Sequence, residues 1–127
     1  MKYEPKIEKE IMCSIEYGLD IFGGKWKSRI LCVLSSADVL RYNAIRKELG
    51  NITDAVLAAM LKEMIADALI SRKQYEEIPP KVEYALTEKG KSVLPILQSI
   101  CHWSRLQTKD ELDKKLAPCR TCPQLTL

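Results

Sequence analysis

The spacing of apolar residues along the first third of the chain predicts two helices. The first covers residues 15–22, where Ser14 can act as the N-cap and a Gly-Gly pair follows the last turn. The second covers residues 25–35. Three residues at helical spacing form its apolar face: Trp26, Ile30 and Leu34. Because this face is broad, we expect the second helix to be central in the core.

The next stretch predicts two further helices joined by a short turn. Residues 41–49 form the first of them, and Gly50 ends it. Thr53 is a good N-cap for the second, and Asp54 at its first position suits the positive end of the helix dipole. Four residues form the apolar stripe of this helix: Leu57, Leu61, Met64 and Ala68.

After residue 70 the pattern changes from a helical period to alternation. Residues 72–76 and 81–87 each read as a strand, and the Pro-Pro turn at residues 77–80 joins them into a hairpin. Thr87 can cap a last long helix. Pro95 lies inside that helix and predicts either a kink or a later helix start.

The order of elements over residues 41–90 is helix, turn, capped helix and hairpin, which predicts a winged helix-turn-helix. The fold class is therefore mainly α with a small β-hairpin (α+β). We expect an N-terminal arm at residues 1–12, the winged domain at 13–107 and a C-terminal helix with a cysteine-containing tail at 108–127. Such a fold aims one helix at a DNA groove and the hairpin at the neighbouring backbone.

The last helix is apolar over too much of its circumference for a single core-facing stripe. Four residues are therefore assigned to a homodimer interface, which the N-terminal and C-terminal helices are expected to form: Ile96, Ile100, Trp103 and Leu106.

Composition adds limits on function. With 127 residues, 46% of them apolar and 29% charged, the chain suits one globular domain. No apolar run approaches the roughly 20 residues of a membrane span, so we expect a cytoplasmic protein with no membrane partner. No nucleophile with a base, metal-ligand set or phosphate loop appears at useful spacing, which predicts no enzyme activity, no metal and no cofactor. The net charge of +3 alone would not indicate DNA.

Several short motifs in order resemble the HxlR family of bacterial winged-helix regulators, relatives of the MarR group. The matching pieces run from Cys13 through residues 23–26 (GGKW), 41–42 (RY), 52–53 (IT) with Leu57, Leu61, Lys62 and Glu63, 67–70 (DALI) and 79–87 (PPKVEYALT). The resemblance implies a homodimeric transcription regulator that binds an inverted-repeat operator on double-stranded DNA. This chain departs from the family pattern at two positions. Family members often have a basic residue where this chain has Ala55, and often have glycine where it has Ala68.

The predicted recognition helix has an outward face of very small side chains. Its candidate DNA-contacting residues are Thr53, Asp54, Ala55, Ala58, Ala59 and Lys62. Short side chains approach base edges and thymine methyls but cannot make the bidentate contact of Arg with guanine. Affinity is then expected from phosphate contacts. The available cations are Arg41, Arg46, Lys47, Arg72, Lys73 and Lys81. The alternative is a winged-helix interaction module in which these alanines are simply good helix formers.

Five cysteines, an odd number, in a chain expected to be cytoplasmic argue against a structural disulfide framework. Cys13 precedes the first helix, whose end can stabilise a thiolate, and matches a thiol sensor of some family members; the alternative is a small buried hydrophobe. Cys119 and Cys122 are candidates for a reversible disulfide, half a zinc site, or inert thiols. Cys101 is a weaker redox candidate.

Two further alternatives stay open at this stage. A small dithiol redox protein would use the cysteine pair of the tail. A small molecule or an oxidant could act as the effector of a regulator, but the sequence shows no ligand-specific group.

Overall fold

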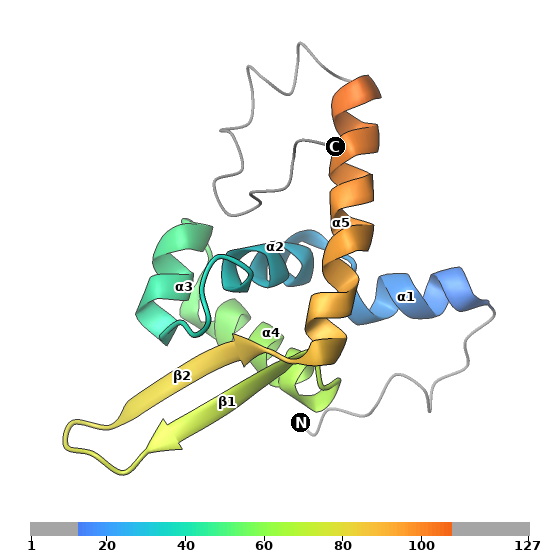
Figure 1. The fold of residues 1–127 in the computed structure, drawn as a ribbon. Helices are drawn as coiled ribbons and strands as arrows, with labels where there is room; N and C mark the ends of the chain where they lie inside the picture. The colour runs from blue at the N-terminus through green and yellow to red at the C-terminus, as the bar shows by residue number, and fades with distance from the viewer. Residues whose placement is uncertain (1–12, 108–127) are drawn as a thin grey trace.

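The computed structural model describes residues 13–107 and contains five helices and one antiparallel hairpin within that range. The elements follow in the order α1 (Ser14–Phe22), α2 (Lys25–Leu34), α3 (Tyr42–Leu49), α4 (Asp54–Ala66), β1 (Ile70–Tyr75), β2 (Lys81–Leu86) and α5 (Glu88–Gln107). Figure 1 shows the hairpin and the far end of α5 projecting from a body formed by α2, α3 and α4. The winged helix-turn-helix and the α+β class are confirmed.

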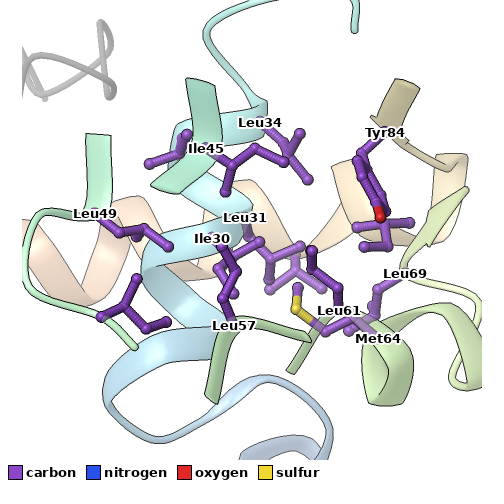
Figure 2. Close-up of a cluster of buried hydrophobic side chains, with 14 of the residues drawn as sticks. Ile30, Leu31, Leu34, Ile45, Leu49, Leu57, Leu61, Met64, Leu69 and Tyr84 are labelled. Carbon is purple, nitrogen blue, oxygen red and sulfur yellow. The ribbon is translucent and has the colours of Figure 1, made fainter. Parts of the chain in front are cut away.

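The core lies where α2, α3 and α4 meet the base of the hairpin (Figure 2). Ile30, Leu31 and Leu34 of α2 are at most 1% exposed, which confirms α2 as the central helix. Ile45 and Leu49 from α3 and Leu57 from α4 close over it. Burying each such side chain stabilises the fold by roughly 1.5–3 kcal/mol. Because α3 and α4 both contribute side chains to this apolar cluster, the cluster holds the two helices at a fixed angle.

The hairpin is attached to the body through Tyr84 on β2. Its strands pair in register from Ile70 opposite Leu86 to Tyr75 opposite Lys81. Leu40, just before α3, forms a β-bridge with Tyr84. The Tyr84 amide donates to the Leu40 carbonyl at 2.8 Å, and the Leu40 amide donates to the Tyr84 carbonyl at 2.9 Å. The base of the hairpin is therefore held against the helix-turn-helix.

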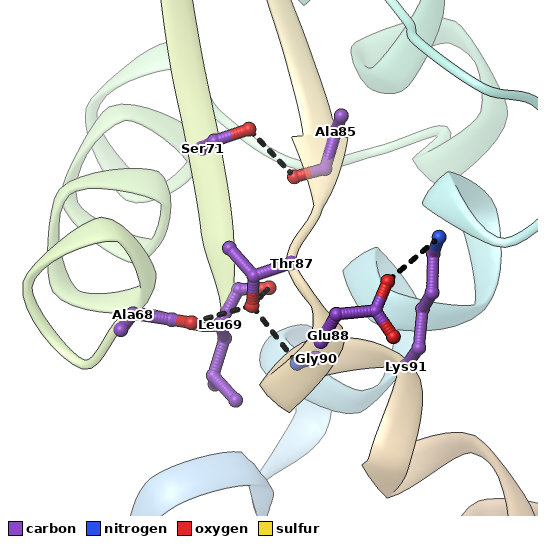
Figure 3. Close-up of polar contacts among 8 residues, drawn as sticks. All are labelled: Ala68, Leu69, Ser71, Ala85, Thr87, Glu88, Gly90 and Lys91. Carbon is purple, nitrogen blue, oxygen red and sulfur yellow. Dashed lines mark hydrogen bonds and ion pairs between the residues drawn. The ribbon is translucent and has the colours of Figure 1, made fainter.

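Thr87 joins the hairpin to α5 and to the end of α4 (Figure 3). Its Oγ1 accepts a hydrogen bond from the amide of Gly90, which confirms the predicted cap, and donates to the carbonyl of Ala68 at 2.6 Å. A Cβ at position 90 would collide with the carbonyl oxygen of Leu69. Glycine at position 90 thus lets α5 start directly against the chain that leaves α4.

Ala68 was wrongly placed in the apolar stripe of the recognition helix. Helix α4 ends at Ala66, and Ala68 is exposed with a φ of +61°. Glycine adopts this left-handed conformation most easily, so an alanine here carries local strain of about 1 kcal/mol. This explains physically why the turn is a position where glycine is favoured.

Two other local expectations are corrected. Ser14 is the first residue of α1 rather than its cap, and Cys13 occupies the N-cap without a side-chain capping bond. Helix α5 begins at Glu88 and continues through Pro95, so the later helix start is wrong. In α1 the face of Ile15 and Leu19 is exposed, and Ile21 is the buried residue.

Within residues 13–107, no helix combines the length and apolarity needed to cross a bilayer.

Candidate nucleic-acid interface

The exposed face of α4 begins at its N-terminus. Thr53 caps the helix by accepting a hydrogen bond of 3.2 Å from the amide of Val56, as predicted. Leu57, Leu61 and Met64 are buried beneath it. The five outward residues of the predicted contact face are all exposed: Asp54, Ala55, Ala58, Ala59 and Lys62. The predicted face is therefore exposed, and three of its five side chains are alanine methyl groups.

Asp54 is the point where α3 and α4 are tied together. Its Oδ1 accepts a hydrogen bond from the Tyr42 hydroxyl at 3.0 Å and lies 3.0 Å from Nε of Arg46. Partial burial, followed by the hydrogen bond to Asp54, raises the pKa of Tyr42 above its ordinary value. Asp54 and Arg46 were both predicted as DNA contacts, and in the structure they also form an ion pair with each other.

The other predicted cations of α3 lie at its two ends. Arg41 occupies the N-cap position and Lys47 lies in the last turn. Both side chains are exposed, as expected for residues that meet a polyanion. Their positions place positive charge at both ends of α3.

A hollow of about 250 Å³ separates the outer face of α4 from the hairpin. Its wall is mainly apolar, with a lysine from α4 and an arginine from β1. The lining residues are Tyr42, Ala58, Leu61, Lys62, Ile65, Arg72 and Tyr84. The structure thus brings together Lys62 and Arg72, two predicted cations that are ten positions apart in the chain.

The remaining hairpin cations lie on its opposite face. Arg72 is directly opposite Tyr84, whereas Lys73 is opposite Glu83 and Lys81 is opposite Tyr75. Because side chains alternate between faces along a strand, Lys73 and Lys81 point away from the face of Arg72. The sequence places these three cations in one set of candidate phosphate contacts, and the hairpin separates them onto two faces.

Lys73 and Lys81 surround a tyrosine on that second face. Each ammonium lies 4.9 Å from the centre of the Tyr75 ring, and the Tyr75 hydroxyl donates to Glu83 at 2.7 Å. This hydrogen bond, reinforced by the charge on Lys81, lowers the pKa of Glu83 against the opposing effect of desolvation. Lys81 also lies 3.6 Å from Glu83, so part of its charge is already compensated within the protein.

Lys27 forms an ion pair between helices that the sequence did not predict. Its side chain is 9% exposed, and its Nζ lies 2.8 Å from Oε2 of Glu63 on α4 and donates to the carbonyl of Asp20 on α1. The pair therefore connects α1 to α4 through α2. No local pattern could reveal it, because Lys27 and Glu63 are far apart in sequence and each suits a solvated helix face.

The predicted dimer residues on α5 are exposed in the single chain. Their exposed fractions are Ile96 48%, Ile100 47%, Trp103 63% and Leu106 67%. On α1, the side chains of Ile15 and Leu19 are also exposed, by 74% and 56%. Large apolar side chains gathered on a helix face mark an interaction surface.

The cysteines differ in their surroundings. Cys13 is exposed at the start of α1, Cys101 is half-buried on α5, and Cys32 packs at the edge of the core. Cys119 and Cys122, with the predicted arm and tail at residues 1–12 and 108–127, lie outside the described residues.

Comparisons with known proteins agree on a helix-turn-helix regulator family. The model of the HxlR-like helix-turn-helix family matches residues 21–112. An uncharacterized HTH-type transcriptional regulator of Methanothermobacter thermautotrophicus is 44% identical over 99 residues, which are 78% of this chain and 75% of the relative.

Two solved structures extend the likeness to the fold. The HTH-type transcriptional regulator YtcD superposes with a TM-score of 0.72 at 38% identity, over 76% of this chain and 97% of that one. The redox regulator HypR in its oxidized form gives a TM-score of 0.69 at 36% identity, over 74% of this chain and 96% of that one.

Proposed function

This chain belongs to the HxlR family of helix-turn-helix transcriptional regulators, and from that membership we propose that it binds an inverted-repeat operator as a homodimer. In this arrangement α4 enters the major groove and the hairpin contacts the adjacent backbone. Two α4 helices related by the dimer axis read two half-sites.

The observation that carries this proposal is the surface formed by α4, the hollow and β1. The outer face of α4 is open to solvent, and its alanines leave room for close approach to base edges. Lys62 and Arg72 flank the hollow beside that face. When α4 lies in the major groove, the sugar-phosphate backbone at the groove edge passes between α4 and the hairpin, where these two cations lie.

Affinity and specificity then come from different residues. Lys62, Arg72, Arg41 and Lys47 contact phosphates and position the protein. Ala55, Ala58 and Ala59 contact thymine methyl groups, which gives modest direct readout, and the shape of the DNA supplies the remaining selectivity. This division favours a DNA-binding protein over an interaction module, since an interaction module needs no cations beside the exposed face of α4.

Replacing Arg72 with alanine is expected to weaken binding to every DNA sequence and to reduce the magnitude of the salt slope by roughly 0.9 for each phosphate that Arg72 neutralises. The same change at Lys81 should have a smaller effect, because Lys81 already lies 3.6 Å from Glu83. The measurement is a titration of binding to operator and to random-sequence duplex DNA across a range of salt concentrations.

Lys91→Ala is the matched control, because it removes one exposed cation from α5. The salt slope of DNA binding by Lys91→Ala should equal that of the original protein. Equal slopes for Arg72→Ala and the original protein would remove Arg72 from the interface. Failure of the original protein to bind either duplex at low salt would support the interaction module.

We also propose that oxidation of Cys13 regulates DNA binding. The thiol is exposed at the N-cap of α1, and α1 connects through the carbonyl of Asp20 to Lys27, which pairs with Glu63 on α4. A peroxide oxidises the thiol to a sulfenic acid and is itself reduced to water or an alcohol. The likeness to HypR, described as a redox regulator, supports this effector class.

Mild peroxide treatment is expected to change operator affinity by about tenfold in the original protein and to leave Cys13→Ser unchanged. Cys32→Ser is the control, because Cys32 lies at the edge of the core and should respond like the original protein. An equal response of Cys13→Ser and the original protein would exclude Cys13 as the sensor.

A further inference from the structure

The N-terminus of α4 carries a negative charge where the helix end would otherwise attract DNA phosphates. Asp54 is the first residue of the helix, and its side chain is 68% exposed. A helix N-terminus carries a partial positive charge and unpaired amide groups, which favour anions. In this protein a fixed carboxylate already occupies that environment.

The same carboxylate holds an arginine that faces solvent. Nε of Arg46 lies 3.0 Å from Oδ1 of Asp54, and the Arg46 side chain is 49% exposed. The Tyr42 hydroxyl binds the same oxygen at 3.0 Å and fixes its orientation. We call Tyr42, Arg46 and Asp54 the junction cluster. Its two charges cancel, so the helix-turn-helix presents a neutral group to DNA at this point rather than a cation.

We propose that Asp54 is a specificity-determining residue that lowers the affinity for non-operator DNA. This inference rests on the proposed DNA-binding function. Binding to random sequence depends almost wholly on phosphate contacts, so a released Arg46 would add one such contact on any DNA. Asp54 withholds that contact, which increases the share of affinity contributed by the bases facing α4.

The effect on the operator complex is smaller for a geometric reason. There the contacts between α4 and the bases set the position of the helix, and Arg46 reaches a phosphate only where that position allows. On random sequence the protein adopts whichever placement brings its cations to phosphates. Removing the Asp54 charge is therefore expected to raise random-sequence binding more than operator binding.

Asp54→Asn is the most informative variant, because its amide oxygen still accepts the hydrogen bond from Tyr42. We expect random-duplex affinity to rise about tenfold for a dimer and the salt slope to steepen by roughly 0.9 for each Arg46 that binds a phosphate. The ratio of operator to random affinity should fall. Adding Arg46→Gln to Asp54→Asn should abolish the gain.

Glu88→Gln is the matched control. Glu88 is the first residue of α5, also follows a threonine cap, and pairs with Lys91 at 3.5 Å. It loses the same charge at the same helical position but lies at the start of another helix. Its binding to both duplexes should equal that of the original protein.

The outcomes separate this inference from the proposed function. If the original protein binds neither duplex, the proposed function fails. If it binds and Asp54→Asn leaves the slope and the ratio unchanged, the inference is overturned. A loss of operator affinity in Asp54→Asn, with random binding unchanged, also overturns it, because Asp54 would then read a base. A gain that persists without Arg46 overturns the role given to that arginine.

Discussion

Replacing Trp103 with aspartate is expected to convert the protein to a monomer and to lower operator affinity by about 100-fold or more. Trp103 is 63% exposed in the single chain and lies on the apolar face of α5 with Ile100 and Leu106. In a dimer that face is buried, and a carboxylate there would lose its hydration without gaining a partner. A monomer binds only one half-site, so it loses the increase in affinity that comes from linking two DNA-binding domains.

Trp103→Phe is the control for this experiment, because it keeps an aromatic ring at the same position. It should remain dimeric in sedimentation equilibrium and retain operator binding. Circular dichroism of Trp103→Asp should match that of the original protein, since the exposed ring does not belong to the core. If Trp103→Asp stays dimeric at micromolar concentration, the dimer interface lies elsewhere.

Replacing Leu57 with alanine should destabilise the fold by about 3 kcal/mol. Leu57 is fully buried on α4 and packs in the cluster that α2 and α3 complete (Figure 2). The cavity left by the missing methyl groups adds to the lost transfer free energy. Because small domains are stable by only about 5–15 kcal/mol, the urea midpoint should fall markedly.

Val56→Ala tests whether burial is the cause. Val56 is the preceding residue on the same helix and is 36% exposed, so its truncation should cost less than about 1 kcal/mol. The variants are compared at one protein concentration, because the proposed dimer would contribute to apparent stability. Equal losses for Leu57→Ala and Val56→Ala would contradict the assigned orientation of α4.

Much of the fold was predictable because its signals are local. The cap at Thr53, the end of α3 at Gly50 and the buried stripe of Leu57, Leu61 and Met64 depend on residues within a few turns of one another. The alternation around the Pro-Pro turn likewise predicted the hairpin and nearly its limits. The incorrect local assignments at Ser14 and Ala68 were at helix ends, where competing hydrogen bonds and turns decide the boundary.

The candidate interface was predictable as a set of exposed residues but not as an arrangement. The small outer face of α4 followed from helical geometry once its buried stripe was known. Which of the cations act together did not follow. Lys62 and Arg72 meet at one hollow, Lys73 and Lys81 share another face with Tyr75, and these groupings depend on how the hairpin packs on α4.

The sequence by itself determined the elements, their order and the buried side of α2 and α4, because periodicity and capping act over short distances along the chain. The tertiary structure decided which charges pair within the protein. Arg46 is paired with Asp54 and Lys27 with Glu63, contacts that form only when separate helices are brought to within about 3 Å. Charge pairing between distant segments has no periodic signature, so the packing of the helices alone reveals it.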